Sequence, residues 1–141
     1  FLYAFTSYAG SWAPPRLWNL RDGALVDVSA EPRYAKFWQR QANTVGKYCR
    51  KGQVGACAAY AAALARVGRA EEGIATAVRY APTADWLPEP CTVDYVNDEC
   101  PDGKALVFEG FEPALRWLLS EQGYLPQVPG QPQAAAGGAG R

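Results

Sequence analysis

The residues with the clearest capacity for chemistry are the four cysteines, which fall in two local pairs. Cys49 and Cys57 enclose one short segment, and Cys91 and Cys100 enclose another. An even number of cysteines in local pairs favours two disulfides and hence an oxidising, extracytoplasmic compartment, whether periplasmic, secreted or at a cell surface. The competing interpretation is a four-cysteine zinc site, although neither pair has the C-x(2–4)-C spacing that brings two thiolates to one metal. We therefore expect disulfides and no metal, with three pairings compatible with the sequence.

A second chemical feature is a group of carboxylates around the later cysteine pair. The chain has no His, so it lacks the commonest general base and metal ligand, and Ser/His/Asp and Cys/His catalysis are excluded. Two carboxylates can still act as acid and base, and residues 94–103 match a calcium loop in part. The alternative function is thus a small carboxylate-dependent enzyme or metal-binding module centred on the Cys91–Cys100 loop. Solvated loop charges are the simpler interpretation, with no catalytic residue and no cofactor. The carboxylates concerned are Asp94, Asp98, Glu99 and Asp102.

The overall composition narrows the class of protein further. The 141 residues suit one domain with a single core. The 14 basic and 14 acidic residues balance, which argues against a nucleic-acid partner. No Met is present, even at position 1, so we expect a processed or truncated chain.

Helices are the elements that would position these residues. Ser29 is suited to cap a helix that runs to Tyr48, and apolar residues recur on one face of it at helical spacing. That face holds Tyr34, Phe37, Trp38, Gln41, Val45 and Tyr48, and is expected to form core. Another helix is predicted over residues 111–125, with Gly123 near its end and Pro126 as a stop.

Between these helices, the segment from Tyr48 to Pro82 is typical of a helical hairpin. Residues 56–67 are rich in Ala, Leu and Arg, which favour helix, and Gly68 supplies the positive φ angle that ends one. A second helix is predicted from Ala70, because acidic residues occupy its first turn and Arg79 its last. This hairpin is the centre of the predicted architecture.

The hairpin resembles the tetratricopeptide repeat, in which a large apolar residue, a small one, another large one, a turn Gly and a Glu-small-apolar trio recur. The positions that carry the resemblance are Tyr60, Ala61, Leu64, Gly68, Glu72, Gly73 and Ile74. The Cys49-to-Cys57 spacing also resembles secreted cysteine-rich helical solenoids, where one cysteine ends a helix and the other opens the next. Residues 48–82 depart from the repeat at Gly73, Tyr80 and Pro82. The resemblance implies a helix pair that binds other proteins.

No second copy of the repeat is visible, although solenoids need about three. We therefore expect a single tetratricopeptide-like hairpin within a helical domain. A short strand is predicted over residues 24–28, and its expected partner is residues 105–109, after the turn at 101–103. Such a two-stranded ribbon is marginal alone and needs a helix to pack on.

The two ends of the chain differ from the middle. Residues 1–20 form an aromatic N-terminal arm, residues 21–126 the disulfide-containing helical domain, and residues 127–141 a Pro/Gly/Ala/Gln-rich tail. The arm is interpreted in three ways: folded over its own core, the remnant of a membrane anchor, or bound to a partner. Its candidate partner-binding residues are Phe1, Leu2, Tyr3, Phe5, Tyr8, Trp12 and Trp18.

Together these features predict a mainly α domain of about four helices, with a small β-ribbon and two disulfides. The function expected is that of a non-enzymatic, extracytoplasmic interaction or structural subunit. Its partner would be another protein or further copies of itself, in a membrane-associated or filamentous assembly, with the N-terminus near a membrane.

Overall fold

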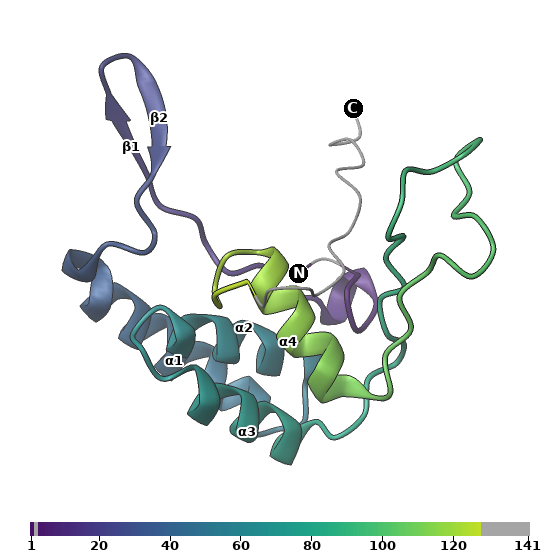
Figure 1. Cartoon of the computed structure of the whole chain (residues 1–141). Helices are drawn as coiled ribbons and strands as arrows, with labels where there is room; N and C mark the ends of the chain where they lie inside the picture. Colours follow the sequence, from purple (N-terminus) through teal and green to yellow (C-terminus); the bar gives the residue numbers. More distant parts are fainter. Residues whose placement is uncertain (2, 128–141) are drawn as a thin grey trace.

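A computed structural model describes residue 1 and residues 3–127 of the chain, and within them it contains four α-helices and a two-stranded sheet (Figure 1). The predicted mainly α class, with a small β-ribbon and two disulfides, is confirmed. In chain order the elements are the 3-10 turn η1 (Tyr8–Gly10), strands β1 (Trp18–Arg21) and β2 (Ala24–Asp27), the 3-10 turn η2 (Pro32–Tyr34), and helices α1 (Ala35–Cys49), α2 (Val54–Ala65), α3 (Ala70–Tyr80) and α4 (Phe111–Glu121).

Helix α2 is the central helix, since it packs against both α1 and α3 (Figure 1). Its sequence, VGACAAYAAALA, is apolar on every side, and a helix of that kind must be covered all round. Ten of its 12 residues are buried. The helical hairpin predicted between residues 48 and 82 is present as α2 and α3.

The turn that joins α2 to α3 depends on Gly68. Its φ angle is +76°, a conformation that residues with a Cβ rarely adopt. The amide of Arg69 donates to the carbonyl of Leu64 at 2.9 Å, and the amide of Gly68 donates to Ala65 at 3.1 Å. These two hydrogen bonds form a Schellman motif, which satisfies carbonyls that the end of α2 leaves free.

The departure from the tetratricopeptide pattern at Gly73 has a steric cause. A Cβ on Gly73 would lie 2.9 Å from the Cα of Ala61, closer than real Cβ atoms come. Glycine therefore allows α3 to approach the backbone of α2 more closely than alanine would.

Two clusters of buried side chains hold the molecule together. The larger one lies where α2, α3 and α4 meet the N-terminal arm, and includes Phe5, Ile74, Leu115 and Leu119. The smaller one lies between α1 and α2 and is built on Trp38, which is 1% exposed. The aromatic face predicted for α1 is confirmed at Trp38 and Val45, but Tyr48 is 39% exposed.

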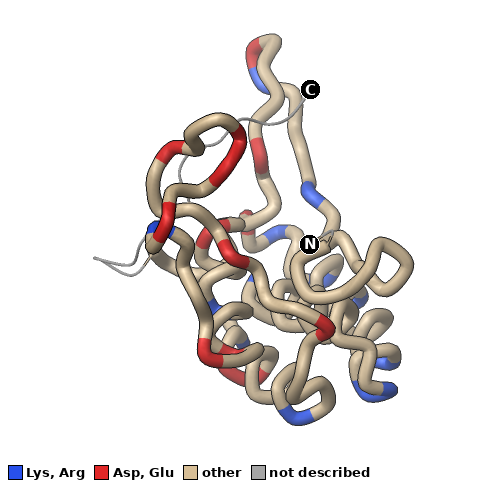
Figure 2. Tube along the Cα trace, turned by 90° about the vertical axis from the view of Figure 1, so that its right-hand side faces the viewer, with Lys and Arg blue, Asp and Glu red and all other residues tan. Residues whose placement is uncertain are grey.

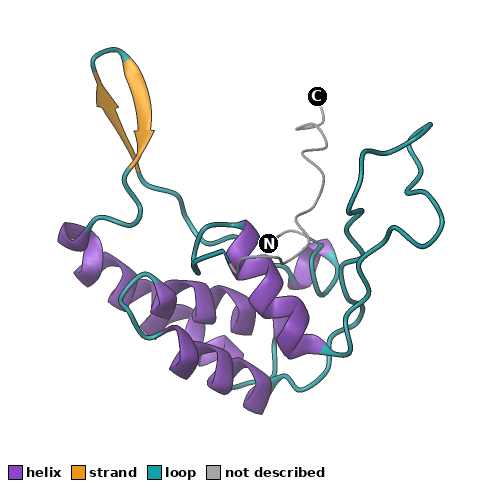
Figure 3. Cartoon of the chain, viewed as in Figure 1, coloured by secondary structure: helices purple, strands orange, loops and turns teal. Residues whose placement is uncertain are grey.

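The predicted pairing of residues 24–28 with residues 105–109 is wrong. Strand β2 pairs instead with the preceding strand β1, in an antiparallel hairpin that places Leu20 opposite Leu25 (Figure 3). Asp22 and Gly23 connect the strands with φ angles of +50° and +79°, as a type I′ turn requires. In the 105–109 segment, an isolated bridge joins Ala105 to Cys91. A local two-residue turn orders the hairpin at a lower entropic cost than a distant pairing.

Two predicted helix boundaries also need correction. Ser29 does not cap a helix, because η2 precedes α1 and neither has a side-chain cap hydrogen bond. Helix α4 ends at Glu121 and not at Leu125, since Gly123 takes a φ angle of +70° two residues later. Among the described residues, no helix combines the length and the apolar character needed to cross a membrane.

Candidate interaction surface

The β1–β2 ribbon extends away from the helices, and so does the long loop between α3 and α4 (Figure 1). A view turned by 90° places both on the same side of the helical layer (Figure 2). The molecule therefore has one face with two projecting elements, which we call the upper face. It consists of the ribbon, residues 18–27, and the loop, residues 88–109.

The ribbon carries an apolar face that nothing in the described chain covers. Side chains alternate between the two faces of a strand, and the register places three apolar side chains, Trp18, Leu20 and Leu25, on the same face as Asp27. Their exposed fractions are 51%, 66% and 69%. A soluble domain rarely leaves such a cluster in water unless a partner covers it. Sequence reasoning missed this face because it paired the wrong strands.

The base of the ribbon is fixed by Ser29, which is only 2% exposed. Its hydroxyl accepts a hydrogen bond from the amide of Leu17 at 2.8 Å, and its carbonyl accepts one from Nε1 of Trp38 at 2.7 Å. Its amide donates to Oδ1 of Asp27 at 2.8 Å. Hydrogen bonds from the side chain and then the backbone of Ser29 lower the pKa of Asp27. Ser29 therefore links the base of the ribbon to α1. It was predicted to cap a helix, and in the structure it has this linking role instead.

The N-terminal arm is folded over the core, which was one of its three interpretations. The ring of Phe5 meets that of Phe111 edge to face at 4.9 Å, and Phe5 is 1% exposed. The hydroxyl of Thr6 donates to the carboxylate of Asp85. Nε1 of Trp86 donates to the carbonyl of Tyr3 at 2.8 Å. The arm is therefore bonded to the chain that follows α3.

The candidate partner-binding residues separate into two groups by exposure. Phe5 is buried, so it is not available to contact a partner. Phe1 is half-buried against Tyr124, and Trp12 is half-buried against Tyr48. Tyr3 and Tyr8 are 59% and 64% exposed, with ring centres 5.8 Å apart. With Trp18 they are the arm residues open to a partner. Leu2 and residues 128–141, most of the predicted tail, lie outside the described residues.

The four cysteines form two disulfides, Cys49–Cys57 and Cys91–Cys100. The first joins the end of α1 to α2 in the core, where both residues are 0% exposed. The second closes the tip of the long loop. Every thiol is used, so the four-cysteine zinc site is excluded.

The carboxylates of the loop do not converge on a common point. Asp94, Asp98, Glu99 and Asp102 are all exposed. Over residues 1 and 3–127, no group of three or more His, Cys, Asp or Glu side chains is placed to hold a metal ion. The same loop exposes apolar side chains between the acidic ones. They are Val93, Tyr95, Val96 and Val107, from 39% to 73% exposed.

Charge is unevenly distributed along the chain despite the overall balance. Residues 32–70 contain eight basic residues and no acidic one, whereas residues 85–112 contain eight acidic residues and one basic one, Lys104. Figure 2 shows the acidic residues along the projecting loop. The upper face thus combines an apolar ribbon with an acidic loop. Counting charges segment by segment would have found this polarity in the sequence.

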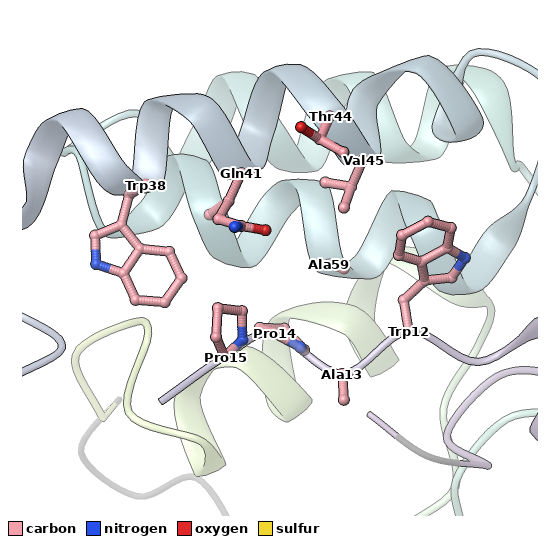
Figure 4. A pocket seen from close by; sticks show the side chains of 10 residues that line it. Trp12, Ala13, Pro14, Pro15, Trp38, Gln41, Thr44, Val45 and Ala59 are labelled. Atoms are coloured by element: carbon pink, nitrogen blue, oxygen red, sulfur yellow. The ribbon is translucent and has the colours of Figure 1, made fainter. Parts of the chain in front are cut away.

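A separate hollow lies between α1, α2 and the arm (Figure 4). Its volume is about 180 Å³, and its lining contains no charged side chain. The lining residues are Trp12, Ala13, Pro14, Pro15, Trp38, Gln41, Thr44, Val45, Ala59 and Ala63.

Comparison with known proteins connects the chain to one family. The family described as "sll0997 C-terminal domain" matches residues 31–123, from the start of η2 to the turn after α4. A relative described as "Probable thylakoid lumen protein sll0997", from Synechocystis sp. (strain ATCC 27184 / PCC 6803 / Kazusa), is 34% identical over 132 residues. The match covers 89% of this chain and 38% of the relative. No solved structure matches the chain. A lumenal relative agrees with the extracytoplasmic compartment expected from the cysteines.

Proposed function

Since this chain belongs to the sll0997 C-terminal domain family, we propose that it is a non-enzymatic protein-interaction module of an extracytoplasmic compartment. The observation that carries the proposal is the uncovered apolar face of the ribbon, Trp18, Leu20 and Leu25. The ribbon extends from the body and is fixed at its base by Ser29, so its side chains are presented to a partner in a defined orientation.

The loop defines the chemistry of the partner's surface. It lies on the same side as the ribbon and carries six of the chain's 14 acidic residues but only one basic residue (Figure 2). Complementary charge attracts the correct partner and repels others. The partner should therefore be apolar where it meets the ribbon and basic where it meets the loop.

Three further observations support the proposal. The resemblance of α2 and α3 to a tetratricopeptide hairpin implies an interaction role. The chain has no His, and the hollow beside α1 has no charged lining residue, so neither offers a general base. The two disulfides suit an oxidising compartment, and the lumenal relative favours the thylakoid lumen in particular.

Site-specific crosslinking in the protein's own compartment tests the proposal. A photo-reactive benzoylphenylalanine replaces Leu20 or Tyr95 on the upper face, and Ala75 on the exposed side of α3 serves as the control. We expect discrete adducts from the first two positions and none from Ala75. The same adducts formed by the purified chain alone would identify the partner as a second copy. Equal adducts from all three positions, or none from any, would contradict the proposal.

A further inference from the structure

The exposed side of α1 carries a row of basic residues, which we call the basic stripe. Their positions recur at helical intervals along α1 and its C-cap, so they share one face. The stripe consists of Lys36, Arg40, Lys47 and Arg50. All four are exposed, and none forms an ion pair in the described part of the chain. Residues 32–70 contain no acidic residue, so nothing on this helix offsets their charge.

The basic stripe works against the stability of the helix that carries it. Like charges one turn apart repel each other, as Lys36 and Arg40 do, and Lys47 and Arg50 repeat the arrangement. Lys36 also lies in the first turn, where the helix dipole is positive. An exposed helix face that only meets water usually carries both signs of charge, which pair along the helix. A face of one sign is expected where an acidic partner supplies the opposite charge.

The tip of the long loop has a defined shape. The amide of Val96 donates to the carbonyl of Glu99 at 2.9 Å, and the amide of Glu99 donates to the carbonyl of Val96 at 3.1 Å. Between them Asn97 and Asp98 have φ angles of +51° and +64°, as in a type I′ turn. The second disulfide closes the loop directly after this turn. The side chains of the tip are therefore pre-organised, which lowers the entropic cost of binding through them.

The tip matches the basic stripe in chemistry. Asp94, Asp98 and Glu99 are exposed and form no ion pair within the described residues. Tyr95 and Val96 lie between them and are 49% and 58% exposed. An aromatic ring can stack on a guanidinium group, and a Val side chain can pack on the methylene stem of a Lys. The tip thus offers partners for both the charged ends and the apolar stems of the stripe.

We propose that the loop tip, residues 94–99, binds the basic stripe of a second copy of this chain. The loop extends away from the helices, so its tip is directed towards a neighbouring molecule (Figure 1). The two unpaired surfaces are opposite in charge and belong to the same chain, so a second copy satisfies both. A flat anionic surface would use the stripe and leave the loop without a partner. This inference rests on the proposed function, because it names the basic partner of the loop.

The contact joins two different surfaces, so it is heterologous. Each copy in a pair still has one free stripe or one free tip. Further copies can therefore add in the same way, and the product is a ring if the rotation closes and an open filament if it does not.

Sedimentation velocity of the purified chain, over a range of protein concentrations, tests the contact. The range of charge interactions falls from about 30 Å at 10 mM salt to about 3 Å at 1 M. We expect association at 10 mM salt, and an affinity at least tenfold weaker at 1 M. Association through the apolar ribbon would not weaken with salt. A chain that is monomeric at 10 mM salt up to its solubility limit, or that associates equally at both salt concentrations, overturns the proposal.

Single charge reversals locate the stripe. Arg40→Glu on α1 and Arg79→Glu on α3 make the same change of charge at exposed residues that have no ion pair in the described chain. We expect Arg40→Glu to weaken association at least fivefold and Arg79→Glu to leave it unchanged. Equal effects of the two variants would mean that net charge, and not the stripe, controls association, and would overturn the proposal.

Two double variants test the pairing itself. The stripe variant is Arg40→Glu with Lys47→Glu, and the loop variant is Asp94→Lys with Glu99→Lys. Asp98 is left unchanged, because its positive φ angle suits Asp better than Lys. Neither variant should associate alone, since like charges would meet. An equimolar mixture should associate, because the native stripe of one variant meets the native tip of the other. Association of either variant alone, or none in the mixture, contradicts the pairing.

Two further measurements separate this inference from its alternatives. Vesicles of phosphatidylglycerol probe a membrane partner, and a monomeric chain that binds them through the stripe overturns the proposal. If the chain is monomeric but Leu20 and Tyr95 still form adducts in the compartment, this inference fails and the proposed function stands. If the chain associates but no adducts form there, the proposed function fails instead. When both hold, the purified chain forms the Tyr95 adduct by itself.

Discussion

The carbonyl oxygen of Gly10 lies so close to Gly55 that a Cβ on Gly55 would clash with it. The arm is thus in direct backbone contact with the first turn of α2, at a point where any side chain would separate them. Because Gly10 belongs to η1, this contact fixes the path of the chain towards the hollow and the ribbon. The aromatic N-terminus is therefore part of the domain and not an appendage.

Replacing Gly55 tests that contact. Gly55→Ala forces a methyl group against the carbonyl of Gly10, and we expect the free energy of unfolding to fall by about 1–3 kcal/mol, as for other overpacked sites. Gly46→Ala is the comparison, since its Cβ would meet side chains and no backbone, namely the ring of Tyr60 at 2.9 Å and the guanidinium of Arg50 at 3.4 Å. Urea unfolding measures both. An unchanged urea midpoint in Gly55→Ala would show that the arm does not rest there in solution.

The two disulfides should differ in what they stabilise. Each closes a loop of similar length, with sequence separations of 8 and 9, for which chain entropy predicts about 2.5 kcal/mol. Cys49→Ala with Cys57→Ala also opens the core, so the unfolding free energy should fall by about 3 kcal/mol or more. Urea unfolding measures this loss.

Removal of the second disulfide should act mainly within the loop. Cys91→Ala with Cys100→Ala releases a segment whose residues 93–99 are exposed, so its effect on global unfolding should be smaller. Chymotrypsin should then cut after Tyr95 faster than in the native chain. Equal stability losses for both double variants would mean that the loop folds together with the helices.

The exposed leucines of the ribbon should be unnecessary for folding. In the double variant Leu20→Thr, Leu25→Thr, two β-branched residues face each other across the strands, and we expect the unfolding free energy to stay within about 0.5 kcal/mol. Leu115→Thr, at a position with 0% exposure, is the comparison and should be strongly destabilising. Crosslinking from Tyr95 should weaken in the ribbon variant. A large loss of stability there would assign the leucines a structural role.

Acid should loosen the contact between α3 and α4. The two terminal nitrogens of Arg116, Nη1 and Nη2, donate to the carboxylate of Glu71 at 2.8 and 2.7 Å, and these hydrogen bonds lower the pKa of Glu71. A carboxyl whose pKa is lower in the folded than in the unfolded chain stabilises the fold above its unfolded pKa, near 4.3. That contribution is lost as the pH falls through the folded pKa.

Glu71→Gln therefore should lose less stability than the native chain between pH 6 and pH 3, by a small margin because the pair is exposed. Glu109→Gln removes an exposed carboxylate that has no ion pair among the described residues, and is the control. Urea unfolding at the two pH values measures the difference. The same pH dependence in all three proteins would mean that Glu71 does not contribute through its charge.

Local signals explain which parts of the fold were predictable. Gly68, with helix formers before it and acidic residues after it, specifies the α2–α3 turn within a few residues. The paired spacing of the cysteines likewise favoured the disulfides that form. The ribbon was predicted with the wrong partner, because residues 1–20, which include most of β1, were assigned to the arm.

The exposed face of the ribbon and the hollow beside α1 could not be predicted from the sequence, because both depend on how separate elements are placed in space. The exposure of Leu20 and Leu25 follows from the direction in which the ribbon leaves the body, which no pattern in residues 18–27 specifies. The hollow depends on the path of Trp12–Pro15 across α1 and α2, and that path is set by the distant contact between Gly10 and Gly55. Sequence periodicity describes single elements, and both features lie between elements.

The position of Phe5 and Thr6 has a consequence for the order of folding. Helices α1, α2 and α3 are neighbours in sequence, so their contacts can form soon after synthesis. Thr6, however, bonds to Asp85, 79 residues later, and Phe5 packs on Phe111, in the last helix. Nascent chains emerge N-terminus first, so Phe5 and Thr6 leave the ribosome long before the residues that they contact have been synthesised. We expect the arm to need protection during export, and to be placed only when α4 docks.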